Sequence, residues 1–432
     1  MLPSSWWSIP RRSSLVVALA MSLVGSPHRS ELSAQQRSDS ARIAELERRL
    51  EAVSVELERL SLGIDVVQAD SSIMGLGPAA SKIYQVTQGV SIGGYGEILY
   101  ENFDADRDDD TPATSLDAID ALRAIVYFGY KFDDRLLFNS EVEIEHASEA
   151  FLEFAYLDYL LTETIGVRAG LLLAPLGLVN EFHEPPVFID AKRSFTENRI
   201  IPTTWRENGI GLFGNGETLN WRLYVMNSLD GAGFNASGLR GGRQRGIRAL
   251  AESLGVAARA DYVGMPGLMV GASGFFGGTG QGRELDGTRV DGNVLVWDAH
   301  AAYEAYGFDL RALVAGARLD DAEELNQLNA LAGAAGVGDE MLGWYVEGGY
   351  DVLSRMDTEH QLHPFARYEM VNTQSSMAPG ATAAPANELT AVSLGAAWRP
   401  LPQVVVKVAR QLISNEAETG TDQWNVQLGW LF

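Results

Sequence analysis

Apolar and polar residues alternate along most of the chain from residue 89 to its end. Leu136 and Val142 fall on one face of their segment, for example, whereas Asn139 falls on the other. Successive side chains of a β-strand point to opposite faces of the sheet, so this period of two indicates strands with one apolar and one polar face. The pattern predicts about sixteen strands: 89–102, 120–132, 135–147, 149–161, 165–174, 207–214, 218–228, 254–263, 267–277, 294–306, 308–319, 341–352, 361–371, 388–398, 402–413 and 422–432.

The connections between these predicted strands sort by parity. Those after even-numbered strands are short, whereas most of those after odd-numbered strands are long. Outer-membrane barrels have short periplasmic turns, long external loops and an even strand number. A β-protein crosses a bilayer only when every backbone polar group is paired internally, which requires closure. We therefore expect residues 89–432 to form an all-β transmembrane antiparallel barrel of about sixteen strands, with lipid outside and a water-filled lumen inside.

The first 34 residues resemble an export signal. Arg11 and Arg12 form a basic start, and Leu15–Gly25 is a short apolar run before a tolerable cleavage site. The alternative is a membrane anchor, but a spanning helix needs roughly 20 apolar residues and this run is shorter. We therefore expect residues 1–34 to be a signal peptide and the mature protein to be exported to the cell outer membrane of a Gram-negative-type cell.

The segment 36–64 has a different, helical period. Apolar residues recur there at spacings of three and four, with Glu and Arg between them, which predicts a short periplasmic coiled-coil helix and self-association, most simply as a homotrimer. The alternative is a single solvated helix that packs on its own domain. Residues 65–88 contain Gly, Ser and Pro and are expected to be a linker. The recurring apolar residues are Ile43, Leu46, Leu50, Val53, Leu57, Leu60 and Ile64.

One connection, residues 175–206, is much longer than its neighbours. It contains turn residues, charges and aromatic residues between two amphipathic strands. Structureless connections of this length are uncommon in compact domains and usually have a function. We expect this inserted loop to fold into the lumen and to narrow it.

Composition restricts the function further. The chain of 432 residues has a net charge of −24, only four lysines and no cysteine. A nucleic-acid-binding protein normally presents a broad basic face, so that class is excluded, and no disulfide or thiolate metal site can form. His183 lies between Glu181 and Glu184, but no metalloprotease pattern surrounds it and Pro185 follows. We expect no metal, no cofactor and no enzymatic activity.

Three stretches around the inserted loop, Ala174–Gly177, Asn180–Pro186 and Ile201–Glu207, resemble bacterial outer-membrane porins of the phosphate-selective O/P type. The terminal Phe432, preceded by alternating aromatic residues, is similar to the C-terminal assembly signal of outer-membrane proteins. The resemblance covers roughly residues 89–432. It implies a homotrimer of sixteen-stranded barrels with an inward-folded loop, through which small anions such as phosphate diffuse. Those porins guide anions with many lysines, so arginine would have to replace lysine here.

The basic residues of the lumen are the candidate anion ligands. A guanidinium group can bind phosphate or carboxylate in a fork, and rings of charge set the selectivity of pores. The alternative is that each arginine pairs with a carboxylate and only stiffens the wall. The candidates are Arg168, Arg222 and Arg259 on the inner face, and Arg193, Arg199 and Arg206 on the inserted loop.

Two further charged groups have more than one interpretation. Glu141, Glu143 and Glu145 share one face of a strand and form either a ladder for cations or a polar wall paired to arginines. A cluster in an external loop is either a funnel for anions, a lipopolysaccharide contact or a solvated loop; it consists of Arg240, Arg243, Arg245 and Arg248.

Together these patterns predict an outer-membrane porin for small hydrophilic solutes, with anions such as phosphate as the expected cargo and outer-membrane lipid as its surroundings. Two alternatives stay open. The channel is weakly selective, cation-preferring or specific for dicarboxylates, or the barrel is plugged and the coiled coil tethers the outer membrane to the cell wall.

Overall fold

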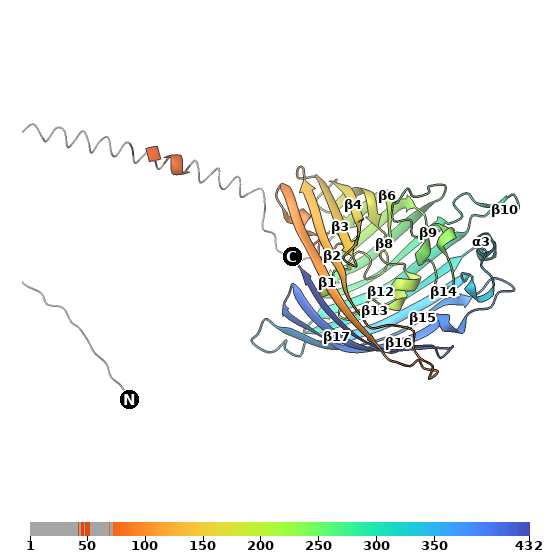
Figure 1. Ribbon diagram of the computed structural model, residues 1–432. Helices are drawn as coiled ribbons and strands as arrows, with labels where there is room; N and C mark the ends of the chain where they lie inside the picture. The colour runs from red at the N-terminus through yellow and green to blue at the C-terminus, as the bar shows by residue number, and fades with distance from the viewer. Residues whose placement is uncertain (1–41, 43–44, 47, 52–68, 70–71) are drawn as a thin grey trace, which may run out of the picture. The chain divides into compact units, whose positions relative to one another are not determined.

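The structure is a computed structural model that describes residues 42, 45–46, 48–51, 69 and 72–432. In this part of the chain sixteen antiparallel strands close into one barrel (Figure 1). Each strand pairs with its neighbours along the barrel sequence, and the first pairs with the last through the register Tyr95 to Leu431. The predicted fold class is therefore confirmed.

All sixteen predicted strands are present, and their ends differ from the prediction by at most five residues. The strands of the barrel are β1 (Gly89–Phe103), β2 (Ala118–Lys131), β3 (Leu136–Glu145), β4 (Glu149–Leu160), β5 (Ile165–Leu173), β6 (Arg206–Asn215), β7 (Leu219–Asn227), β8 (Leu254–Met265), β9 (Leu268–Gly278), β12 (Asn293–Ala305), β13 (Phe308–Leu319), β14 (Glu340–Tyr350), β15 (Gln361–Ser376), β16 (Glu388–Leu401), β17 (Val404–Asn415) and β18 (Gln423–Leu431).

A few small elements do not form part of the barrel wall. The strands β10 (Glu284–Leu285) and β11 (Thr288–Arg289) form a hairpin, and the helices are α2 (Lys82–Gln85) and α3 (Ala322–Leu328). The single helical turns are η1 (Pro185–Val187), η2 (Thr196–Ile200), η3 (Gly231–Gly233), η4 (Arg240–Gly242), η5 (Gly333–Ala335) and η6 (Pro385–Asn387). No helix in the described part of the chain is both long and apolar enough to cross a membrane.

The two faces of the wall have opposite characters. On β7, Leu223 and Val225 expose 46% and 43% of their surface on the outside, whereas Tyr224 between them is fully buried on the inside. The outer face is a band of large apolar side chains, and the inner face carries most of the buried charged residues. This is the reverse of a soluble protein, in which large exposed apolar patches are rare.

The two ends of the barrel differ in their connections. We call the end with the short turns the turn end and the opposite end the loop end. β1 begins and β18 ends at the turn end, where the N–H of Phe432 donates to the carbonyl of Gly94 at 2.8 Å and the reverse bond measures 3.0 Å. These bonds extend the β1–β18 seam to the last residue.

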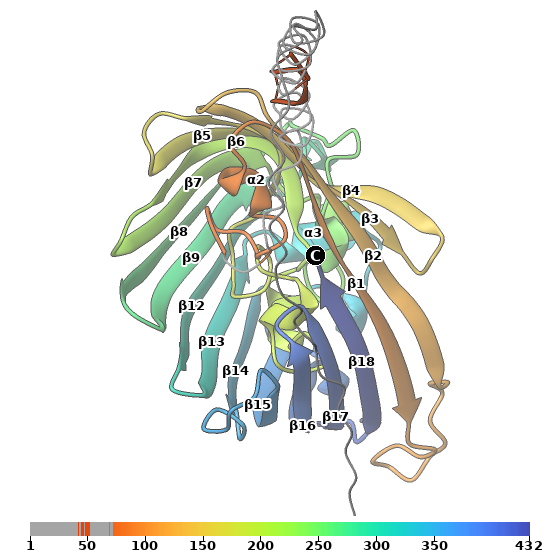
Figure 2. The same ribbon diagram turned by 90° about the vertical axis from the view of Figure 1, so that its left-hand side faces the viewer.

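The sequence predicted that residues 65–88 form a linker. For residues 72–88 the structure contradicts this prediction. They lie inside the turn end of the barrel, where Leu76, Ile83 and Val86 are each 1% exposed. In Figure 2 the orange stretch around α2 lies within the ring of strands. A linker exposes its backbone to water, whereas this stretch buries apolar side chains against the inner wall. We call residues 72–88 the plug segment.

Farther upstream the structure describes only part of the helix-forming sequence. Residues 42, 45–46 and 48–51 are helical, and Arg49 donates a 3.0 Å hydrogen bond to Glu45 one turn earlier. The predicted signal peptide (1–34) and most of the predicted coiled coil (36–64) lie outside the described residues, so both stay predictions.

Candidate functional site in the barrel lumen

The inserted loop, which joins β5 to β6 through residues 174–205, is closed at its base by one asparagine. Asn180 donates from Nδ2 to the carbonyls of Ala174 at 2.6 Å and Trp205 at 3.0 Å, and its Oδ1 accepts the N–H of Trp205 at 2.8 Å. Trp205 is fully buried, with its ring 4.7 Å from that of Phe275 on β9. A buried amide with its bonds satisfied is costly to displace, so the loop leaves the wall in a fixed direction.

The loop crosses the lumen and is bound by the far wall. Arg399 on β16 donates to the carbonyl of Pro186 at 3.0 Å, and Lys407 on β17 donates to the carbonyl of Asp190 at 2.9 Å. Figure 2 shows the yellow-green loop inside the ring of strands. Since both cations bind main-chain carbonyls, they fix the path of the loop.

Farther along, a buried carboxylate organises the loop itself. Glu197 accepts the N–H groups of Leu178 and Val179 at 2.6 and 2.8 Å, and it accepts the hydroxyl of Tyr345 on β14 at 2.9 Å. These three donors tie the beginning and the end of the loop to each other and to the wall.

The predicted wall arginines face the lumen but have carboxylate partners. Arg168 pairs with Asp158 of the neighbouring strand at 2.9 Å, and Arg259 pairs with Asp261 at 2.7 Å. Both arginines are less than 5% exposed. The pairs match the stiffening role that the sequence left open as an alternative, and an anion here would have to displace a carboxylate from a buried arginine.

The next two candidates are also neutralised. Arg222 approaches Glu181 at 3.8 Å and donates to the carbonyl of Trp221 at 2.9 Å. Arg206, at the end of the inserted loop, forms a short ion pair with Glu153 of β4. Both arginines are 3% exposed, and their anion-binding role remains a prediction.

The three glutamates of β3 line the inner face as the strand period predicts. Glu141 accepts from Nε2 of His183 at 3.1 Å, while Glu143 and Glu145 pair with Arg123 of β2 at 2.8 and 3.1 Å. Glu143 and Glu145 thus have the arginine partner that the polar-wall interpretation requires, Glu141 has a histidine partner, and a path for cations along them stays a prediction.

A cavity of about 300 Å³ lies beside the inserted loop, in the lumen between its middle and the loop end. We call it the arginine cavity. Residues of β1, β2, β17 and β18 form one side, and the inserted loop and the loop between β7 and β8 form the other. Its charged lining consists of Glu97, Arg123, Lys192, Arg193, Arg199 and Arg240.

Two of these cations are neutralised and three are not. Lys192 pairs with Glu101 at 2.5 Å, and Arg123 pairs with three glutamates of the wall. Within the described residues, Arg193, Arg199 and Arg240 form no ion pair. Three guanidinium groups without a carboxylate partner therefore border one cavity.

All three arginines are half-buried, and Arg199 and Arg240 have surroundings that are unusual for cations. The Arg199 guanidinium lies 5.1 Å from the ring centroid of Phe195, and Nη1 of Arg240 is buried without a hydrogen-bond partner in the described structure. Burial, together with the charges of Arg193, Arg245 and Arg123, lowers the pKa of Arg240 to about 10. A lowered pKa means that the cationic form is penalised here, and a bound anion would relieve that penalty.

The arginine cluster of the external loop is divided among three roles. Arg240 borders the cavity, which periodicity could not show because loops have no period. Arg243 braces the inserted loop, since its Nη1 donates to the carbonyls of Thr203 and Thr204 at 3.0 and 2.8 Å. Arg245 and Arg248 are exposed.

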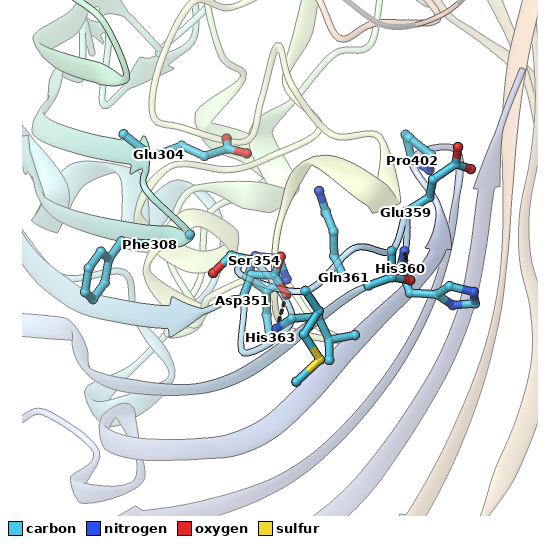
Figure 3. Close-up of a pocket in the computed structure, with 14 residues that line it drawn as sticks. Glu304, Phe308, Asp351, Ser354, Glu359, His360, Gln361, His363 and Pro402 are labelled. Atoms are coloured by element: carbon cyan, nitrogen blue, oxygen red, sulfur yellow. Dashed lines mark hydrogen bonds between the residues drawn. The ribbon is translucent and has the colours of Figure 1, made fainter.

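A second cavity, of about 760 Å³, lies at the turn end among the β12–β13, β14–β15 and β16–β17 connections (Figure 3). Glu304, Asp351, Glu359 and His363 line it. Asp351 accepts the N–H of Leu353 in the same connection at 3.0 Å and the N–H of Leu362 at the start of β15 at 2.9 Å. Over the described residues no group of three or more His, Asp or Glu side chains is arranged to hold a metal ion.

Comparison with known structures defines the class of this barrel. A loop-deletion variant of OmpT, an outer membrane protein of Vibrio cholerae, matches with a TM-score of 0.50 and 12% identity over 80% of this chain and all of that one. An anion-selective porin from Comamonas acidovorans matches with the same TM-score, identity and shares. The protein therefore has the sixteen-stranded barrel fold of the porins.

Sequence comparison then gives the family. A protein of Aquifex aeolicus (strain VF5), described as an uncharacterized protein, is 37% identical over 390 residues, which are 87% of each chain. The chain belongs to the family of this Aquifex protein. No family model matches the chain.

Proposed function

We propose that this protein is an outer-membrane porin through which small hydrophilic solutes, above all small anions such as phosphate, diffuse passively. The observation that carries the proposal is the arginine cavity. There, Arg193, Arg199 and Arg240 lack carboxylate partners beside a loop that crosses a closed barrel. A guanidinium group offers a phosphate or carboxylate two parallel hydrogen bonds, so the cavity has the donors that a small oxyanion needs.

The outer surface supports a membrane location. Large apolar side chains are exposed around the wall, and Trp297, Trp398 and Trp424 are 39%, 42% and 46% exposed. Transmembrane barrels present such an apolar band with aromatic residues at its edges. The cell outer membrane is therefore the proposed location, with outer-membrane lipid around the barrel.

The resemblance to phosphate-selective porins of the O/P type supports phosphate among the small anions. The acidic lining of the second cavity and the many paired arginines favour weaker selectivity. A dicarboxylate or a weakly selective channel is accordingly the second candidate.

Single-channel recording in planar bilayers tests the proposal. The wild-type protein should give discrete conductance steps, a reversal potential in a KCl gradient that indicates anion preference, and block by added phosphate. The double variant R193Q/R240Q should move the reversal potential toward cations. It should also weaken phosphate block by about tenfold or more, because each charge-assisted hydrogen bond contributes roughly 1.5–3 kcal/mol.

The control is R245Q/R248Q, which removes the same charge from exposed positions of the same external loop. It should leave phosphate block nearly unchanged. If R193Q/R240Q behaves like this control, the arginine cavity is not the anion site. If the folded wild-type barrel carries no current, the channel function is wrong and the tether alternative takes its place.

A homotrimer is proposed on two grounds. The predicted heptads and the resemblance both favour it, and Leu46 and Leu50, which are 58% and 74% exposed, provide apolar side chains for helix association. Conductance steps in groups of three would support this state.

A further inference from the structure

The plug segment is a compact piece of chain inside the barrel. Ser81 holds it together: its Oγ donates to the carbonyl of Gly77 at 2.7 Å and accepts the N–H of Ile73 at 2.9 Å. Ser81 is fully buried, as is nearly all of Leu76. The segment therefore keeps its shape through internal bonds.

The plug segment is attached to the wall by side chains rather than by strand pairing. Tyr84 donates to Asp158 at 2.6 Å, and Asn139 donates to the carbonyl of Ala80 at 3.0 Å. Residues 73–86 belong to no strand. Contacts of this kind can break one by one without opening the sheet.

A single carboxylate joins the plug segment to the inserted loop. Glu184 accepts the N–H of Ala79 at 3.1 Å and that of Ala80 at 3.0 Å. Gly77 makes the approach possible, since a Cβ at that position would lie 2.5 Å from the Glu184 carboxyl carbon. The plug segment and the inserted loop thus form one continuous barrier inside the barrel.

We propose that the plug segment is a gate on the turn-end side of the lumen, latched to the inserted loop through Glu184. The inference rests on the proposed channel function. The segment covers the inner wall from β1 to β7, as its contacts with Gly93 and Arg222 show. On the β12–β17 side the turn end keeps the cavity of about 760 Å³ (Figure 3). Undocking the segment joins the two sides and widens the path.

A reversible cross-link tests whether the segment moves. An added Cβ at Gly129 would lie 3.0 Å from the Cβ of Ile83, slightly closer than the roughly 3.5–4.5 Å of a disulfide. The chain has no other cysteine. In I83C/G129C, oxidation should abolish the larger conductance events, and reduction should restore them. The control is each single cysteine variant under the same two conditions.

Release of the latch should have the opposite effect. The variants E184A and Y84F should each increase the time spent in the larger conductance state. The exposed turn residue Glu163 provides the control E163A. Labelling of an A80C variant with a water-soluble maleimide reports undocking without any current, because Ala80 is 4% exposed. Adding E184A should speed this labelling by about tenfold or more, because the plug segment loses the acceptor of two hydrogen bonds and each charge-assisted bond contributes roughly 1.5–3 kcal/mol.

The readouts separate the gate from the channel. Faster labelling in a protein that carries no current would support a mobile segment and contradict the porin function. Current that is identical in the oxidised, reduced and E184A proteins, with unchanged labelling, would overturn the gate and leave the porin function intact.

Discussion

Charged side chains in this lumen fall into two groups according to their partners. Arg168 and Arg259 are deeply buried and ion-paired, whereas Arg193 and Arg240 are half-buried and lack a carboxylate. Removing one partner of a buried pair leaves a costly uncompensated charge, so the loss of either partner in the first group should destabilise the wall. The second group gains from an added anion. The candidate anion site is therefore marked by arginines that lack a carboxylate partner, and not by the presence of arginine alone.

The proposed gate should depend on pH, because the carboxyl group of Glu184 titrates near neutral pH in the docked state. Burial raises its pKa to about 7, although the N–H groups of Ala80 and Ala79 and the charge of His183 act to lower it; the charge of Glu141 adds to the rise. When the plug segment leaves, water reaches the carboxyl group and its pKa falls toward the ordinary value. The docked state consequently binds the proton more tightly, so docking strengthens as pH falls through about 7 and weakens as pH rises.

We therefore expect A80C to be labelled more slowly at a pH of about 5.5 than at about 8, after correction for the reactivity of the thiol itself. The added substitution E184Q should flatten this dependence, since an amide does not titrate. A dependence that persists in A80C/E184Q would assign the pH sensor to another group, with the His183–Glu141 pair as the nearest one.

The inserted loop shows how an element without regular structure is held in place. One amide closes its base, one carboxylate ties its two halves, and cations of the far wall bind its carbonyls. Loops normally lie on the surface because buried backbone needs partners. Here the loop's own buried side chains and the polar inner wall of the barrel supply those partners.

Asn180 gives a test at this scale. The variant N180A removes three hydrogen bonds and leaves the buried N–H of Trp205 without an acceptor, whereas the carbonyls of Ala174 and Trp205 keep a backbone donor each. We expect a loss of about 1–3 kcal/mol in unfolding free energy and noisier open-channel current. Urea unfolding and bilayer recording measure the two effects. The control is N198A, which removes a side chain of the same type beside the arginine cavity and should change the unfolding free energy much less. If both variants lose the same unfolding free energy, Asn180 does not have a special role in holding the loop.

At the scale of the whole barrel, the apolar outer band fixes the orientation of every strand. A shift of one residue would turn the outer side chains inward, so the band also fixes register. Closure removes free strand edges, which a membrane does not tolerate. The same closure forces the charged inner faces of all strands toward one lumen.

A charged residue on the outer face should reduce the folding free energy by an amount that depends on how deep it lies in the membrane. Leu223, near the middle of β7, and Leu219, at its turn-end start, are similarly exposed at 46% and 49%. Folding of L223R into phospholipid vesicles should be less favourable by about 2–4 kcal/mol, whereas L219R should cost about 0–1 kcal/mol. Equal costs at the two positions would contradict a membrane-spanning band. Reversible folding monitored by tryptophan fluorescence supplies the measurement.

The strands could be predicted from the sequence because their signal is local. The alternation that contains Leu136 and Val142 needs no knowledge of distant residues, and it placed strand ends within a few positions. The inner-face location of Arg168 and Glu143 followed from the same period. Their pairing did not, because the neighbour of an inner side chain depends on the register between strands.

The arginine cavity illustrates what the same reasoning missed. Arg193 and Arg199 were candidates, but Arg240 was assigned to an external cluster because a loop carries no periodic signal. The plug segment was taken for a linker on its Gly, Ser and Pro content. Its burial depends on a partner, Glu184, more than 100 residues away in the chain.

By itself, then, the sequence determined the sixteen strands, their two faces and the position of the inserted loop between β5 and β6. Each of these follows from the spacing of neighbouring residues and from the need to pair every backbone group in lipid. Only the tertiary structure decided which charges neutralise one another, which three arginines border the cavity and where the plug segment lies. Those outcomes are set by closure of the barrel, which brings residues far apart in the chain into a confined lumen where each buried charge must find a partner.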